Sequence, residues 1–286
     1  MPHSYRLLIS CPDQVGIVAS ISDFIAKHNG WITEAHQYAD PENEWFFMRY
    51  VVKAESLPFN IEKFRKLFSP IAEKFSMNWE ITDSQVKKKV VLMVSRQSHC
   101  LSELLYHWRS GDMEFDIPCV ISNHDDLRSY VEWHGIPYYY VPVDPDNKQP
   151  HFDMVKKHIE DVDADAIVLA RYMQIIPAEL CESYPGQIIN IHHSFLPSFI
   201  GARPYHQAAE RGVKLIGATC HYVTSELDAG PIIEQDVIRV NHHNSTEDMV
   251  RLGKNVEKTV LTQGLRFHIE DRVLIHGNKT IVFNQG

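Results

Sequence analysis

Two stretches of the chain hold polar residue types that can act on a carbonyl group. Asn190 and His192 stand where the apolar run of residues 187–191 ends, and His221 is followed seven residues later by Asp228 in a turn-forming segment. An Asn amide can donate to a carbonyl oxygen as it becomes negative, and a His with an Asp can move protons near neutral pH. These types suit the addition of a nucleophile to a carbonyl, without a Ser or Cys nucleophile. Taken singly, each residue has an ordinary alternative, because such side chains often satisfy local hydrogen bonds at strand ends.

The elements that must position these side chains form a repeated βα pattern from about Lys88 onward. Apolar strands are predicted at residues 90–95, 117–122, 138–143, 166–170 and 187–191, with helical patterns at 99–110, 125–134, 151–162 and 177–184. Repeated βα units predict a doubly wound, mostly parallel sheet, in which ligands bind beyond the carboxyl ends of the strands. Two further strands are predicted at 215–224 and 231–240. A long helix then opens at the capping signal of Ser245 and Asp248, and a final hairpin turns at Gly277 and Asn278.

The first part of the chain carries a different pattern. It predicts, in order, a strand at 5–10, a helix beginning near Val18, a hairpin turning at 40–43, a helix at 60–75 and a strand at 77–83. The order βαββαβ is that of a ferredoxin-like sheet with both helices on one face. The polar segment 83–89 has no apolar period, so the sequence predicts one domain at 1–84 and a second at 88–286.

Composition excludes several classes of partner. The chain has 286 residues and a net charge of −9, so no basic field is available to hold nucleic acid. No apolar run approaches the roughly 18 residues of a membrane span, and the N-terminus has no signal-peptide core. The five cysteines are odd in number and form no C-x-x-C pair. They argue against a disulfide framework, and the sequence therefore predicts a cytoplasmic protein with neither nucleic acid nor membrane as a partner.

Two longer segments carry a resemblance to a known family. NIHHSFLPSFIGARPYHQA begins at Asn190 and HYVTSELDAGPII begins at His221. Over roughly residues 88–240 the chain resembles the folate-dependent formyltransferases. The resemblance implies a catalytic trio of Asn190, His192 and Asp228, with His221 flanking the same site.

A third segment, LARYMQII, resembles the strand and loop whose backbone reads the pterin ring in that family. The resemblance implies folate contacts at Met173, Gln174 and Ile176. For Met173 and Ile176 the alternative is plain core packing.

The N-terminal part resembles an ACT domain, with the sequence DQVG, from Asp13 to Gly16, at its first loop. This resemblance implies an amino-acid effector, a homo-oligomer, or both. An ACT module in front of a formyltransferase-like domain, with His-His-Ser at 192–194 where transformylases have His-Pro-Ser, resembles the family of formyltetrahydrofolate deformylases. It implies hydrolysis of 10-formyltetrahydrofolate to tetrahydrofolate and formate for purine biosynthesis, with the folate as substrate and no cofactor.

The segment SRQSHC, residues 95–100, follows the first strand of the second domain and contains no glycine. A glycine-rich turn whose backbone amides hold the phosphate of an acceptor is therefore not expected, which leaves water as the nucleophile. The alternative is a formyltransferase that uses the same trio on an amine acceptor such as a ribonucleotide, with Arg96 and His99 contacting its anion. A non-enzymatic sensor is a third hypothesis, which the intact trio disfavours.

The adjacent His pairs at 192–193 and 242–243 lack a third spaced ligand, so no metal site is expected.

Overall fold

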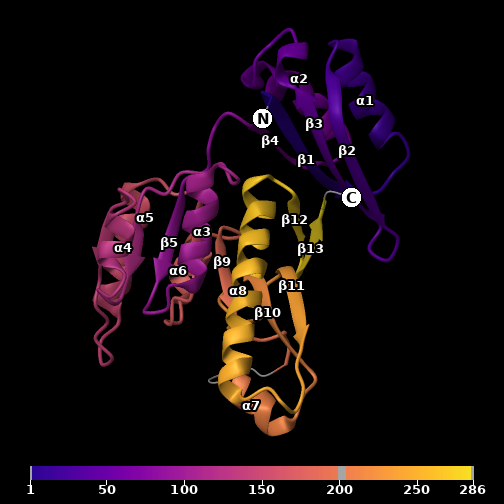
Figure 1. Cartoon of the computed structure of the whole chain (residues 1–286). Helices are drawn as coiled ribbons and strands as arrows, with labels where there is room; N and C mark the ends of the chain where they lie inside the picture. Colours follow the sequence, from indigo (N-terminus) through magenta and orange to yellow (C-terminus); the bar gives the residue numbers. More distant parts are fainter. Residues whose placement is uncertain (1, 199–203, 285–286) are drawn as a thin grey trace. The chain divides into compact units, whose positions relative to one another are not determined.

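The computed structural model describes residues 2–198 and 204–284 of the chain (Figure 1). By contacts between Cα atoms, the chain divides into two compact units. The first holds Met1–Lys87 together with Glu270–His276 and Ile281–Gly286, and the second holds Lys88–Ile269 with Gly277–Thr280.

The first unit has the predicted βαββαβ order. Its elements are β1 (Ser4–Pro12), α1 (Ile17–Lys27), β2 (Trp31–Asp40), β3 (Trp45–Lys53), the 3₁₀ turn η1 (Ala54–Ser56), α2 (Ile61–Lys74) and β4 (Asn78–Asp83). The strands form one sheet in the order β2-β3-β1-β4, and each neighbouring pair is antiparallel. Alternate residues of β1, including Leu7 and Ile9, share one core with Ile21 of α1 and Phe64 of α2. Both helices therefore cover one face of the sheet, as the sequence predicts.

The C-terminal segment that joins this unit is held by a buried arginine. The Arg49 guanidinium donates from Nε to the carbonyl oxygen of Asp271 at 2.8 Å, and from Nη2 to that of Glu270 at 3.0 Å. Its Nη1 atom donates to Glu34 at 2.7 Å. By contacts, Glu270–His276 thus belongs with the first unit, whereas the sequence predicts that it is part of a second domain at 88–286. The hairpin of β12 (Val273–His276) and β13 (Lys279–Val282) turns where predicted, with Gly277 at a φ of +58°.

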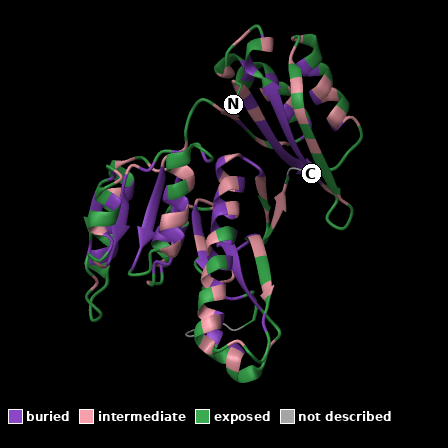
Figure 2. Ribbon diagram, viewed as in Figure 1, coloured by how far each residue is buried: buried purple, intermediate pink, exposed green. Residues whose placement is uncertain are grey.

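The second unit is built on a seven-stranded sheet. Its strands are β5 (Val90–Val94), β6 (Val120–Ser122), β7 (Tyr138–Tyr140), β8 (Ala166–Leu169), β9 (Ile188–His192), β10 (Leu215–Tyr222) and β11 (Ile232–Arg239). Their order is β11-β10-β9-β8-β5-β6-β7. The pairs from β9 to β7 are parallel, and β10 and β11 are antiparallel additions, which confirms the predicted mostly parallel sheet. Figure 2 shows its central strands buried, and every residue of β5 is buried.

Helices α3 (His99–Ser110), α4 (Arg128–Glu132), α5 (Gln149–Asp161), α6 (Ala178–Ser183), α7 (Pro204–Arg211) and α8 (Thr246–Ile269) connect or cover these strands. Strand β7 is shorter than the predicted 138–143, because Pro142 has no N–H for a sheet ladder. Helix α8 opens as predicted: Asp248 donates its backbone N–H to the Ser245 hydroxyl at 3.1 Å, and the Asp248 carboxylate accepts the Ser245 backbone N–H. None of the helices in the described parts of the chain is long and apolar enough to span a membrane.

The strand order of the seven-stranded sheet predicts where a crevice for a ligand opens at its edge. Strand order reverses between β5, which leads to β6, and β8, which leads to β9. At such a switch point the loops after the two strands diverge and leave room for a ligand. Here the two loops meet at one side chain, because the Ser95 hydroxyl accepts the backbone N–H of Met173 at 3.0 Å and donates to Asn123 at 2.7 Å.

Candidate active site

A cavity of about 500 Å³ lies beyond the carboxyl ends of β8 and β9. Every residue that the sequence assigns to the catalytic trio, its flanking imidazole or the folate pocket lines this cavity. These residues are Asn190, His192, Asp228, His221, Met173, Gln174 and Ile176. The structure therefore brings together side chains from the end of β9, the end of β10, and the two loops that follow β8 and β10.

His192 and Asp228 form the central pair of the cavity. His192 is the last residue of β9, and its Nδ1 atom lies 3.3 Å from Oδ1 of Asp228. The hydrogen bond from His192 lowers the pKa of the Asp228 carboxyl, against the opposing effect of burial. On the other side of the ring, Nε2 is buried with no hydrogen-bond partner among residues 2–198 and 204–284. The imidazole is thus oriented through one nitrogen and keeps the other for a ligand.

Asn190 and His221 extend this pair, because they face each other in the register of β9 and β10. The His221 Nδ1 atom lies 2.9 Å from the carbonyl oxygen of Tyr222, to which it donates. Nε2 of His221 is then the acceptor for the Asn190 amide, 3.2 Å away. Burial lowers the pKa of His221, so this ring is neutral near pH 7. One N–H of the Asn190 amide is used in this contact, which leaves the other for the cavity.

The residues expected to contact folate differ in exposure. Met173 is 56% exposed, so its side chain is not a core residue, and its backbone N–H is fixed by Ser95. Ile176 is 8% exposed and packs in the core with Tyr172 and Leu180. Core packing is therefore the main role of the Ile176 side chain, although the residue also lines the cavity.

The proposed effector loop, Asp13 to Gly16, belongs to the first unit, where Gly16 precedes α1 with a φ of +98°.

A buried charged cluster that was not predicted from the sequence lies beside the cavity. Arg171, two residues beyond β8, lines the cavity and is 7% exposed, and its Nε lies 3.4 Å from Oε2 of Glu257. Glu257, on α8, is 1% exposed; His99 donates to its Oε2 at 2.7 Å and Tyr205 donates to its Oε1 at 2.6 Å. Burial would raise the pKa of Glu257, but the bonds from His99 and Tyr205 and the charge of Arg171 lower it. The sequence did contain one sign that Glu257 is buried, because this residue falls at helical spacing among the apolar residues of α8.

His193 lies between this cluster and the trio. The residue lines the cavity, and its ring centroid is 5.3 Å from that of His192. Burial, followed by the charge of Arg171, lowers the pKa of His193 to about 4. The ring is therefore neutral near pH 7, and it does not repel the cation beside it.

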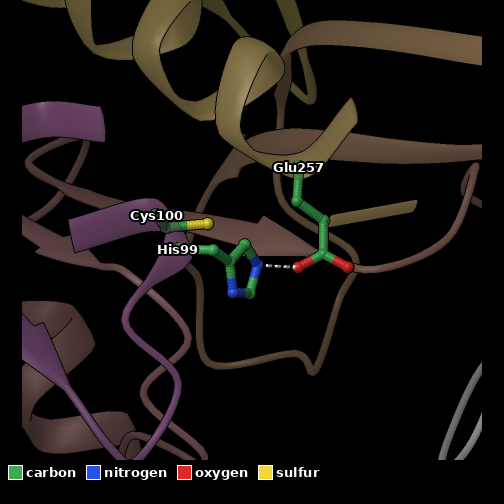
Figure 3. A group of neighbouring side chains, drawn as sticks. All are labelled: His99, Cys100 and Glu257. Atoms are coloured by element: carbon green, nitrogen blue, oxygen red, sulfur yellow. Dashed lines mark hydrogen bonds and ion pairs between the residues drawn. The ribbon is translucent and has the colours of Figure 1, made fainter. Parts of the chain in front are cut away.

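One group could be considered for a metal ion. His99, Cys100 and Glu257 place one potential ligand atom each within 4.8 Å of one another (Figure 3). Burial raises the pKa of the Cys100 thiol, which opposes the thiolate that a metal needs. The carboxylate already has Arg171 and two hydrogen-bond donors as partners. The cluster therefore fits an internal ion-pair network better than a cation site.

Comparisons with known proteins show which family the chain resembles over its length. Residues 88–265 match the model of the formyl transferase family. Formyltetrahydrofolate deformylase from Bacillus subtilis is 47% identical over 283 residues, which covers 98% of this chain and 93% of that protein. A crystal structure of a formyltetrahydrofolate deformylase from Pseudomonas syringae pv. tomato is 63% identical, with a TM-score of 0.98, over 99% of this chain and 95% of that chain.

A glycinamide ribonucleotide transformylase from Symbiobacterium toebii resembles a smaller part. It is 27% identical with a TM-score of 0.65, and the match covers 69% of this chain and 95% of that one. The deformylase matches cover both units, whereas the transformylase match leaves about a third of the chain uncovered. The chain belongs to the formyltetrahydrofolate deformylase family.

Proposed function

We propose that the protein hydrolyses 10-formyltetrahydrofolate to tetrahydrofolate and formate. In this reaction the oxygen of water bonds to the formyl carbon, the bond from that carbon to the folate nitrogen breaks, and the nitrogen takes a proton. The observation that carries the proposal is the His192 and Asp228 pair: Nε2 of His192 has no hydrogen-bond partner within the described parts of the chain, and Asn190 lines the same cavity. The names of its relatives support the same activity.

The roles of the trio follow from its hydrogen bonds. Asp228 and His192 together orient a water and remove its proton, since the Nδ1 contact holds the pair and leaves Nε2 of His192 for the water. The oxyanion that forms on the formyl oxygen is stabilised by the Asn190 amide and by the protonated ring of His192. Collapse of this intermediate expels the folate nitrogen.

The loop after β5 supports water as the nucleophile. Ser95 is occupied by the Met173 backbone and by Asn123, and His99 is bonded to Glu257. The polar groups of this loop that could have held the anion of an acceptor are thus used in internal bonds, with the exception of exposed groups such as Arg96. A formyltransferase would need that anion to be held close to the trio.

Formate release in the absence of any acceptor tests the proposal. Purified full-length protein is mixed with 10-formyltetrahydrofolate in an amine-free buffer, and formate is measured with time. We expect catalytic formate release, which a sample without protein does not give. Release that begins only when an amine such as a ribonucleotide is added, with the formyl group appearing on the amine, would identify a transferase instead.

For the first unit we propose an ACT-like regulatory or oligomerisation domain over residues 1–84, with a small amino acid as effector near Asp13 and Gly16. Its βαββαβ sheet supports this assignment. Equilibrium dialysis of the full chain against single amino acids tests effector binding; the full chain is needed because Arg49 is bonded to Glu270 and Asp271. Sedimentation of the same sample tests the homo-oligomer.

The cellular setting that we propose is the cytoplasm, where the formate would supply purine biosynthesis. All five cysteines are free and buried, which fits a reducing compartment. Fractionation of cells and measurement of purine dependence in a strain without the protein test these two points.

A further inference from the structure

Arg171 is a buried cation that donates no hydrogen bond to the parts of the chain that the structure describes. The residue is 7% exposed and lines the cavity. Its Nε atom is buried and forms an ion pair with Glu257, but it has no hydrogen-bond partner among the described residues. Donors buried in this way are costly unless a ligand satisfies them. Arg171 also has a φ of +66°, in the left-handed region that non-glycine residues rarely adopt and that is often found at ligand sites.

Glu257 does not form a bidentate pair with the fork of this guanidinium, that is, with two of its parallel N–H groups. Its two oxygens accept hydrogen bonds from His99 and Tyr205, and only the 3.4 Å ion pair joins it to Nε of Arg171. The contact offsets part of the positive charge but leaves the parallel N–H groups of the guanidinium without an acceptor. A planar carboxylate that binds two of those N–H groups is the ligand that such a fork matches best.

The reaction produces such a ligand in the same cavity. We propose that Arg171, next to His193, binds the formate product beside the point at which the trio releases it. The inference rests on the proposed function, which makes formate a product. Formate is small and planar, and it carries a negative charge close to the Asp228 carboxylate, which would repel it. A cation at Arg171 counters that repulsion and holds the product away from Asp228 until it leaves.

Glu257 then competes with formate for one cation. Replacement of Glu257 by Gln removes the competing charge while keeping groups that can bond His99 and Tyr205. Formate should consequently bind more tightly to the Glu257→Gln variant than to the unchanged protein. Replacement of Arg171 by Gln should have the opposite effect, because the fork and its charge are both lost.

Binding of ¹³C-formate to the full-length protein, followed by broadening of its NMR signal, tests the proposal without turnover. Since Arg171→Gln alone would leave Glu257 buried without its cation, the double variant Arg171→Gln/Glu257→Gln keeps the charge balanced. We expect formate affinity to fall by about ten- to a hundredfold in the double variant. Arg109→Gln, which changes an exposed arginine of α3, serves as the matched control and should bind formate as the unchanged protein does.

The outcomes separate this inference from the proposed function. Equal broadening in the unchanged protein and the folded double variant would show adventitious binding and overturn the inference. A protein that releases formate from 10-formyltetrahydrofolate but shows no formate binding would likewise overturn the inference and keep the function. A protein that binds formate at Arg171 but never releases it from the folate would instead refute the function.

Discussion

His192, the last residue of β9, and Asp228, in the loop between β10 and β11, lie with Nδ1 and Oδ1 3.3 Å apart. The contact decides which nitrogen of the ring can act on a substrate. Nδ1 is directed to the carboxylate, so Nε2, which has no hydrogen-bond partner among residues 2–198 and 204–284, is the nitrogen left for a substrate. A carboxylate that fixes an imidazole in this way also stabilises the ring when it takes a proton.

Replacement of Asp228 by Asn keeps the shape of the side chain but removes its charge. We expect kcat for formate release to fall by about two to four decades, since the pair can no longer orient and deprotonate water. KM for the folate should stay near its normal value, because the cavity is otherwise unchanged. Steady-state kinetics measure both. Glu226→Gln, an exposed carboxylate two residues earlier, is the control and should keep full activity.

Replacement of His192 by Ala removes the imidazole ring, and with it the Nε2 atom that takes the proton of the water in the proposed reaction. Turnover should fall by about two to four decades, with folate binding retained, as measured by kinetics and by fluorescence titration with the folate. The exposed His243→Ala is the matched histidine control. Near-normal kcat in folded His192→Ala would remove His192 from the trio and leave Asp228 to act through another group.

His193 should make stability depend on pH in a defined window. Its pKa is lowered to about 4, first by burial and then by the charge of Arg171, whereas the unfolded chain has an ordinary histidine value of about 6.5. The unfolded state thus binds more protons between these values, and stability falls as pH decreases from about 6.5 to about 4. In the His193→Gln variant we expect the unfolding free energy to fall by about 2 kcal/mol less over this pH range. This figure is reduced to take account of the partial exposure of the ring.

Urea unfolding at pH 7, 5.5 and 4.5 measures the effect in both proteins. The difference in unfolding free energy between the unchanged protein and His193→Gln should shift in favour of the variant as pH falls. A difference that stays constant across these pH values would show that His193 titrates alike in the folded and unfolded chain.

The meeting of Asn190, His192 and Asp228 in one cavity could be predicted from the sequence, whereas the charged cluster beside it left only the helical spacing of Glu257 as a sign. These three residues lie at the end of β9 and in the loop after β10, within two long motifs, and ligands of such sheets bind beyond the strand ends. Arg171 and Glu257 are instead far apart in the chain, and only the packing of α8 on the sheet brings them together. The same limit applies to the C-terminal segment, because Arg49 gives no local sign that it will bind the carbonyl groups of Glu270 and Asp271.

Arg49 should therefore be a main determinant of the stability of the first unit. The residue is 2% exposed, and its guanidinium bonds two backbone carbonyl groups and Glu34. Replacement by Met fills a similar volume but leaves two carbonyl oxygens and a carboxylate without this donor. We expect a loss of about 3 kcal/mol or more in unfolding free energy.

The control for this variant is Arg65→Met. Arg65 is exposed and bonds a single carbonyl group, that of Ile81 at 3.1 Å, so its replacement should cost no more than about 1 kcal/mol. Chemical denaturation followed by circular dichroism compares the two variants, and limited proteolysis shows whether the C-terminal segment is released. In Arg49→Met we expect early cleavage near residues 270–276, since the bonds to Glu270 and Asp271 are lost. Equal stability of the two variants would contradict the assignment of this segment to the first unit.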